Sequence, residues 1–289
     1  MTDFRGLRIG FIGGGNMAGA IIGGLVKSGF SAANMVVSEP FEEARNRLEQ
    51  QFGVHVTADN AQAIAHQGRA VDVVILAVKP QVMKLVAEGI APAVQAHRPL
   101  VISIAAGITI PDLSRWLLTG AAGAAELAIV RCMPNTPALV VEGATGMFAA
   151  PGVSDAQKAM AAAVLESVSK RNYWVANESL IDVVTGVSGS GPAYFFLLVE
   201  CLEAAGVQLG LPADVARGLA AQTCLGAGRM LEATGEDPAE LRRKVTSPKG
   251  TTEAALNSLE ASGIRGIFVE AVNRATERGA ELGQIMGQQ

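Results

Sequence analysis

A cluster of glycines near the start of the chain joins a predicted strand to a predicted helix. Residues 7–12 form an apolar run, and residues 17–27 have helical character. Gly13, Gly15 and Ala18 supply the pattern G-x-G-x-x-A between them. There the first glycine allows the tight turn, the second lets the backbone approach a pyrophosphate, and the third small residue allows close helix packing. The alternative is a glycine-rich turn without a ligand. The residues expected to bind a dinucleotide are Gly13, Gly14, Gly15, Asn16 and Met17.

An acidic residue follows the next predicted strand, 35–38. Ser38 and Glu39 stand at its end, where a carboxylate can accept a hydrogen bond from a ribose 2′-hydroxyl and repel a 2′-phosphate. This pattern favours NADH. Arg45, one helical turn later, could instead serve a phosphate, so the choice between NADH and NADPH stays open.

Three more predicted strands end in residues that could reach the same cofactor, because ligands of open α/β sheets bind outside the carboxyl ends of the strands. A solvated loop lysine is the alternative interpretation of Lys79. The strand ends are Val78-Lys79-Pro80, Ala105-Ala106-Gly107 and Met133-Pro134-Asn135.

A second candidate site lies far along the chain, in the loop 245–252. Ser247, Gly250, Thr251 and Thr252 precede an apolar helix. The free N–H groups of a helix N-terminus can bind a carboxylate, which makes this loop a candidate substrate site. Thr251 and Thr252 could instead simply cap the helix.

The glycine-rich stretch 185–192 is similar at first sight to the turn that carries a nucleophilic serine. Its spacing does not fit G-x-S-x-G, because residue 190 is a serine, and no base is evident. We expect a turn between two helices where backbones approach closely, beside the nicotinamide.

Composition restricts the class of protein. The 289 residues are 49% hydrophobic and 17% charged, with a net charge of −4. The longest uninterrupted apolar run, 193–199, is too short to cross a bilayer, so we expect the surplus apolar surface to lie between subunits rather than in a membrane. The net negative charge argues against a nucleic-acid partner.

The ionisable and thiol side chains suggest no metal site. Cys132, Cys201 and Cys224 are far apart and are interpreted as buried thiols in a reducing compartment. The three histidines all precede residue 98, in polar surroundings. Residues 1–5 do not have the pattern of a secretory signal, so a cytoplasmic enzyme is expected.

The arrangement of elements predicts two domains. Strands alternate with helices up to residue 177, as in a parallel, doubly wound α/β sheet of the Rossmann type. Within it, residues 60–66 and 155–170 are expected to be helices. Residues 178–289 are expected to form an all-helical dimerisation and substrate domain, in which the segment 194–202, apolar all round, is buried on every side.

Several of these stretches together resemble pyrroline-5-carboxylate reductases. The resemblance covers residues 8–282, and the run 247–260 is its most specific part. The matching stretches are 10–17, 77–81, 133–137, 185–194 and 247–260. The resemblance implies reduction of 1-pyrroline-5-carboxylate to L-proline by NAD(P)H, the last step of proline biosynthesis. It also implies homodimers through interlocked helical domains, and larger rings of dimers.

The resemblance assigns roles to individual residues. Asn60 and Lys79 would contact the cofactor, and Ala105 and Ala106 would lie near its nicotinamide end. Residues 250–252 would hold the substrate carboxylate. Thr252 Oγ would hydrogen-bond the imine nitrogen, as an orienting group or as a proton donor.

Two other functions compete with this one. A β-hydroxyacid dehydrogenase shares the two-domain plan, but it needs a lysine base where this chain has Phe195. A nucleotide-sensing protein without turnover would not need the second anion site at residues 247–252.

Overall fold

The computed structural model describes residues 3–120 and 126–288; Met1 and Thr2 of the N-terminal segment lie outside them. Contacts divide the chain into two compact units. The first runs to Gly189 and includes the chain from Arg274 on, and the second is Ser190–Asn273. The domain boundary expected after residue 177 stays a prediction, because contact density alone does not define a folding domain.

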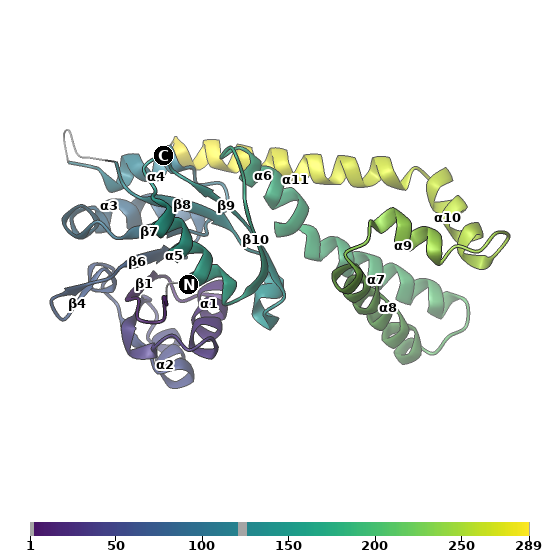
Figure 1. Cartoon of the computed structure of the whole chain (residues 1–289), viewed down its shortest axis with the longest axis horizontal. Coiled ribbons are helices and arrows are strands. Elements are labelled where there is room, and N and C mark those ends of the chain that lie inside the picture. Colours follow the sequence, from purple (N-terminus) through teal and green to yellow (C-terminus); the bar gives the residue numbers. More distant parts are fainter. Residues whose placement is uncertain (1–2, 121–125, 289) are drawn as a thin grey trace. The chain divides into compact units, whose positions relative to one another are not determined.

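An eight-stranded sheet forms the centre of the first unit (Figure 1). Its order is β10-β9-β8-β7-β6-β1-β2-β3. The neighbouring strands β8, β7, β6, β1, β2 and β3 are parallel to one another. β9 is antiparallel to β8, and β10 is parallel to β9. The strands are β1 (Ile9–Ile12), β2 (Met35–Ser38), β3 (His55–Thr57), β6 (Val73–Leu76), β7 (Leu100–Ser103), β8 (Ile129–Met133), β9 (Gly143–Ala149) and β10 (Ser169–Trp174).

Helices cover both faces of this sheet, as expected for a doubly wound fold. All residues of β1, β2, β6 and β7 are buried, which explains their nearly continuous apolar sequences. One helical layer contains α1 (Asn16–Lys27), α2 (Glu42–Phe52) and α5 (Asp155–Glu166); the other contains α3 (Pro80–His97) and α4 (Ile110–Leu117). The chain reverses its direction of winding between β1 and β6, where a cofactor crevice is expected.

Two predicted helices differ from the structure. Residues 60–66 form only a 3₁₀ turn, η2 (Ala61–Ala63), and then the hairpin of β4 (Ala65–His66) and β5 (Arg69–Ala70). Gln67 and Gly68, with φ of 51° and 74°, supply its two-residue turn. The helix predicted to reach residue 170 ends at Glu166, because residues from Ser169 onward pair with β9 in the sheet.

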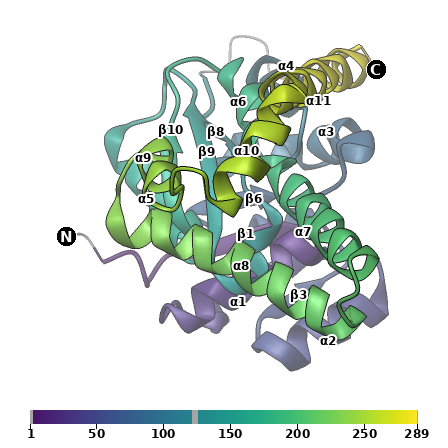
Figure 2. The same ribbon diagram turned by 90° about the vertical axis from the view of Figure 1, so that its right-hand side faces the viewer.

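The second unit is helical, as predicted. It contains α7 (Gly191–Gln208), α8 (Ala213–Thr234), α9 (Pro238–Lys244), α10 (Thr251–Ala261) and the beginning of α11 (Ile264–Gly287). α7 and α8 form a helical hairpin through residues 209–212 (Figure 2). Gly210 and Gly235, with φ of 101° and 63°, follow the ends of these two helices, where a left-handed backbone favours glycine.

The apolar segment of α7 is exposed in the single chain, contrary to prediction. Phe195 is 59% exposed and Phe196 68%. The prediction was wrong for one chain because α7 packs mainly against one neighbour, α8. For the same reason Cys201 is exposed and Cys224 half-buried, whereas only Cys132 is buried as predicted. Burial raises the pKa of the Cys132 thiol.

One helical stretch of the described residues, Leu180–Gln208, is long and apolar enough in composition to cross a membrane. The uninterrupted apolar run 193–199 did not predict such a stretch, because Glu200 ends that run. Core helices of globular proteins pass the same test of length and composition.

Candidate functional site

The glycine loop joins the ends of three strands. Gly13 follows β1 with φ of 99°, and a Cβ there would lie 2.8 Å from the carbonyl oxygen of Ala77 after β6. Its N–H donates to the carbonyl oxygen of Ser38 at the end of β2, at 2.8 Å. Only glycine suits this position, since the backbone is left-handed and the neighbouring chain is too close for a side chain.

The same loop leaves room for an anion. A Cβ added at Gly15 would meet no atom of the described residues within 4 Å. Gly15 is the N-cap of α1, so the N–H groups of the first turn have no partners inside the helix. Ala18 is buried against the sheet. These features fit a pyrophosphate bound at the start of α1, as predicted for residues 13–17.

Two predicted cofactor residues contact each other at the next strand end. The hydroxyl of Ser38 donates to Oδ1 of Asn60 at 2.5 Å. Ser38 is buried, and Asn60 begins the turn η2 after β3. The contact places Asn60 beside the end of β2, where an adenosine ribose is expected in this fold.

The carboxylate of Glu39 is bound to the glycine loop itself. Oε2 accepts the N–H of Gly14 at 2.9 Å, and Oε1 accepts the N–H of Phe41 at 3.2 Å. The guanidinium of Arg45 donates from Nη1 to the carbonyl oxygens of Glu39 and Pro40, at 2.8 Å each. Acidic and basic groups therefore both stand at this strand end, as the sequence predicts.

The strand end after β6 lies next to the glycine loop. Val78 is half-buried, and its Cγ1 would lie 3.0 Å from a Cβ at Gly13. Pro80 begins α3, and Lys79 is its N-cap with an exposed side chain. The exposed ammonium group is free to turn toward a bound phosphate or toward water, so the role of Lys79 stays a prediction.

The loop after β7 is held tightly. Ala105 is buried, and its N–H donates to Ser103 Oγ at 3.4 Å. Gly107, with φ of 79°, packs against α11, where a Cβ on Gly283 would lie 2.4 Å from the Gly107 carbonyl oxygen. Ala105 and Ala106, predicted near the nicotinamide, thus belong to a loop backed directly by the end of α11.

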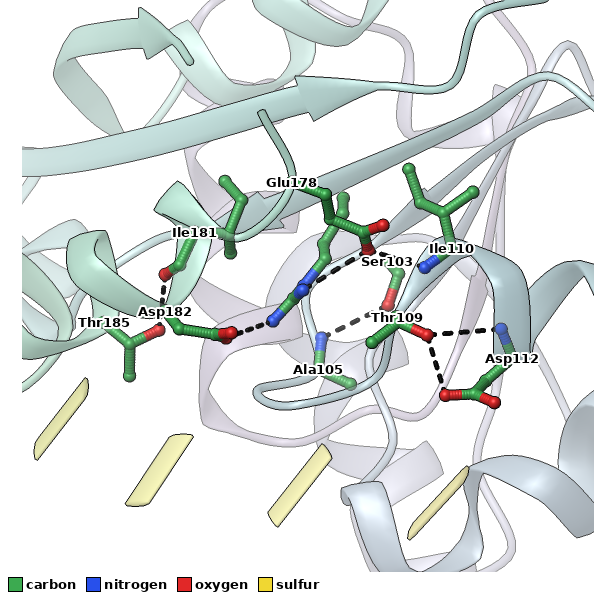
Figure 3. Close-up of polar contacts among 10 residues, drawn as sticks. Ser103, Ala105, Thr109, Ile110, Asp112, Glu178, Ile181, Asp182 and Thr185 are labelled. Atoms are coloured by element: carbon green, nitrogen blue, oxygen red, sulfur yellow. Dashed lines mark hydrogen bonds and ion pairs between the residues drawn. The ribbon is translucent and has the colours of Figure 1, made fainter. Parts of the chain in front are cut away.

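An ion cluster beside this loop, with a buried arginine and two half-buried carboxylates, was not predicted from the sequence (Figure 3). Arg131 on β8 is 2% exposed; its Nη2 lies 2.7 Å from Asp182 Oδ1 and its Nη1 3.3 Å from Glu178 Oε1. The same oxygen of Glu178 accepts the N–H of Ile110 at 2.6 Å. Among the described residues, Nε of Arg131 has no hydrogen-bond partner. The available signal was a charge inside an otherwise apolar strand.

The glycine-rich stretch 185–192 forms a π-helical turn, η4 (Thr185–Gly189), between α6 (Leu180–Val184) and α7. Nδ2 of Asn135 donates to the carbonyl oxygen of Ser188 at 3.1 Å. A Cβ on Gly189 would lie 2.6 Å from Cε of Met133. The turn between two helices is present as predicted, and side chains from the end of β8 pack against it; the close approach of two backbones stays a prediction.

The second candidate site is an uncapped helix N-terminus. Gly250, which has no side chain to cap with, is the N-cap of α10, and Thr251 and Thr252 are its first two helical residues. Capping by the two threonines is therefore wrong as an explanation of this loop. Glu253 Oε2 accepts the N–H of Lys249 at 2.7 Å and fixes the turn before the helix.

Residues 3–120 and 126–288 contain no group of three histidine, cysteine or acidic side chains placed to hold a metal ion. The cofactor residues belong to the first compact unit, and Ser247, Gly250, Thr251 and Thr252 to the second.

Glu39→Ser tests the role of the carboxylate at the end of β2. We expect the ratio of kcat/KM for NADPH over NADH to rise about tenfold, because the variant removes a negative charge near the expected 2′-phosphate. The matched control is Glu42→Gln, which removes an exposed charge from the first turn of α2. An unchanged ratio would show that Glu39 only braces Gly14.

Family comparisons match both parts of the chain. A model described as "Pyrroline-5-carboxylate reductase dimerisation" matches residues 178–282. A model described as "NADP oxidoreductase coenzyme F420-dependent" matches residues 8–107. The two matches together include the predicted cofactor residues from Gly13 to Ala106 and the loop 247–252, but not the strand end at residues 133–135.

Curated relatives and solved structures agree with these matches. A pyrroline-5-carboxylate reductase of Pseudomonas aeruginosa is 46% identical over 281 residues, 97% of this chain and 98% of the relative. One of Synechocystis is 41% identical over 279 residues, 96% and 99% of the two chains. The structure of a pyrroline-5-carboxylate reductase from Coxiella burnetii matches with a TM-score of 0.87 at 41% identity, over 96% of this chain and 98% of that one. One from Plasmodium falciparum, with NADP bound, gives 0.82 at 28% identity, over 97% and 100%. The chain belongs to the pyrroline-5-carboxylate reductase family.

Proposed function

We propose that this protein reduces 1-pyrroline-5-carboxylate to L-proline with NAD(P)H, the last step of proline biosynthesis. The observation that carries the proposal is the uncapped N-terminus of α10 at Gly250, in a chain that also has a dinucleotide loop at residues 13–17. One site suits a small carboxylate and the other a pyrophosphate. Membership of the family supports the pairing of the two.

The cofactor site is made by the strand ends of the first unit. Gly13 and Gly15 let the backbone approach the pyrophosphate, and the start of α1 supplies N–H donors. Ser38 and Asn60 stand at the expected ribose position. The nicotinamide supplies the hydride when it is bound. The NADP-bound structure of the Plasmodium falciparum relative supports NADPH as one accepted form.

The substrate site is the beginning of α10. The N–H groups of Thr251, Thr252 and Glu253 lack partners inside the helix, so they can donate to the substrate carboxylate. Thr252 is half-buried in the first turn, and its Oγ can hydrogen-bond the ring nitrogen. Ser247 accepts the Gly250 N–H through its carbonyl oxygen at 3.0 Å, which shapes the loop.

The chemistry does not require a strong acid. A cyclic imine nitrogen is basic enough to arrive protonated, and an iminium accepts hydride better than a neutral imine. The protein then has to orient two rings and exclude water. A site of hydroxyls and backbone N–H groups meets that demand, with Thr252 as the orienting group.

A dehydrogenase that oxidises a β-hydroxyacid fits the site less well. Such a reaction needs a general base, and Phe195 on α7 cannot accept a proton. The assay also distinguishes an enzyme from a nucleotide-sensing protein without turnover. It would bind NAD(P)H and leave the imine unreduced.

The test is a spectrophotometric assay with 1-pyrroline-5-carboxylate and each nicotinamide in turn, with the Thr252→Ala variant alongside the natural protein. Thr252→Ala should lower kcat about tenfold to a hundredfold, the scale of one lost hydrogen bond to a charged group. NAD(P)H binding, measured by titration of cofactor fluorescence, should stay nearly unchanged.

Thr252→Ser is the matched control, because it keeps the hydroxyl and should recover most of the activity. Full activity in Thr252→Ala would remove Thr252 from the mechanism. Tight binding of NAD(P)H without imine reduction by the natural protein would identify a sensor instead of an enzyme.

We also propose that the protein is a cytoplasmic homodimer that assembles further into a ring. The exposed aromatic and aliphatic side chains of α7 support the dimer, because apolar surface of this kind normally lies at an interface. The match of residues 178–282 to a dimerisation family supports the same surface. A subunit interface, rather than a bilayer, would then cover the apolar stretch Leu180–Gln208.

Phe196→Glu should break the dimer, because it places a charge on this surface. Its mass, measured by size-exclusion chromatography with light scattering, should fall to that of one chain. Leu85→Glu, which changes a 76% exposed leucine on α3, is the control and should leave the mass unchanged. A monomeric natural protein, or an unchanged mass for Phe196→Glu, would contradict the proposal.

A further inference from the structure

We propose that the C-terminal end of α11 and the cluster of buried Arg131 with Glu178 and Asp182 position the loop 104–109 for hydride transfer. This loop carries Ala105 and Ala106, which are expected at the nicotinamide, so the inference rests on the proposed function. Arg131, Glu178, Asp182 and Gly283 are positioning residues in this account, and none of them touches the substrate.

The first contact on the loop comes from behind, through α11. Gly279, Gly283 and Met286 form the buried face of the end of α11. A Cβ on Gly107 would lie 3.1 Å from the backbone nitrogen of Gly283 and 3.4 Å from the carbonyl oxygen of Gly279. Two backbones therefore meet with no side chain between them. A shift of α11 toward the loop must move the loop, because a close-packed contact leaves no free volume between the two backbones.

The end of α11 is itself anchored to α4, which follows the loop directly. Nη2 of Arg115 donates to the carbonyl oxygen of Gly287 at 2.7 Å and lies 2.8 Å from Asp112 Oδ1. Asp112 also accepts the hydroxyl of Thr109 at 2.7 Å. Thr109 is the last residue of the loop. Asp112 therefore contacts both the loop, through Thr109, and Arg115, which binds the end of α11.

The second contact fixes the point where the loop becomes α4. Glu178 Oε1 accepts the N–H of Ile110, the first residue of α4, and also faces Arg131 on β8 (Figure 3). A carboxylate at a helix N-terminus is favourable, and here the cation on β8 holds that carboxylate in place. The start of α4 is therefore tied to the sheet by one shared oxygen.

The third contact joins the cluster to α11. Asp182 pairs with Arg131, and a Cβ on Gly279 would lie 3.8 Å from the Asp182 side chain. Thr185, at the start of η4, donates its hydroxyl to the carbonyl oxygen of Ile181, next to Asp182. The cluster thus binds β8, α4, α6 and α11 around one loop, and a shift of about 1 Å in such a loop can cost up to a hundredfold in rate.

Gly283→Ala is the sharpest test, because its new Cβ would lie 2.4 Å from the Gly107 carbonyl oxygen and must push the loop. The matched control is Gly89→Ala in α3, where an added Cβ meets no described atom within 4 Å. Glu178→Gln is the second variant, since it keeps an oxygen for Ile110 but removes the charge. All are compared with the natural protein in single turnover, by following nicotinamide absorbance with enzyme-bound NAD(P)H and 1-pyrroline-5-carboxylate.

Positioning predicts that Gly283→Ala and Glu178→Gln lower the hydride-transfer rate about tenfold, leave the amplitude unchanged, and leave the KM for NAD(P)H within about twofold. Amide hydrogen exchange in residues 104–110 should also become faster in both variants and stay unchanged in Gly89→Ala. Exchange does not depend on turnover, so it tests the loop even without activity.

Two results would overturn the inference. One is a rate in Gly283→Ala equal to that of Gly89→Ala. The other is a loss of amplitude at an unchanged rate, which would mean that the variants only reduce the folded fraction. Absence of imine reduction by the natural protein would instead refute the proposed function. Amide hydrogen exchange in residues 104–110 would then test by itself whether α11 and the ion cluster hold the loop in place.

Discussion

The structure depends on a close approach of backbones where the sheet reverses its winding. A Cβ on Gly10 would lie 1.9 Å from the carbonyl oxygen of Ala63, and one on Gly13 would lie 2.8 Å from that of Ala77. Glycine at both positions lets β1 sit deep in the sheet and turn at once into α1. The crevice for a dinucleotide exists because no side chain fills this point. The adjoining residues Ser38, Glu39 and Val78 all contact the glycine loop at residues 13 and 14.

Most of the sheet could be predicted from sequence because its buried strands leave a strong local signal. Residues 73–76 are continuously apolar and β-branched or leucine, as in strands covered on both faces. The hairpin at residues 65–70 was missed, because its strands are too short to show alternation and its turn needs φ above zero at Gln67. The burial of α7 was misjudged for a different reason. An apolar sequence indicates that a surface is covered, but it does not indicate whether the same chain covers it.

The candidate site likewise contains features that the sequence predicts and features that it does not predict. The glycine loop and the Gly250 loop were predictable because backbone N–H chemistry has a sequence pattern of small residues before a helix. The orientation of Glu39 was not, because either 2′-hydroxyl recognition or loop bracing suits an acid at that strand end. The ion cluster was not predicted because Arg131, Glu178 and Asp182 are far apart in sequence and meet only in the fold. A lone charge in an apolar strand predicts that a partner exists but not which residue it is.

A buried arginine is a costly way to add stability alone. Removing one partner of a buried ion pair typically destabilises a protein by about 3 to 5 kcal/mol, whereas well-packed apolar residues of similar volume can do as well as the pair. What the arginine adds is direction, since its planar guanidinium binds two carboxylates at fixed angles. At residue 131 those carboxylates hold the start of α4 and the helix that leads into η4. A reaction without a strong acid depends on the placement of its two rings, and a directional cluster around buried Arg131, behind the loop 104–109, would supply the rigidity that such placement requires.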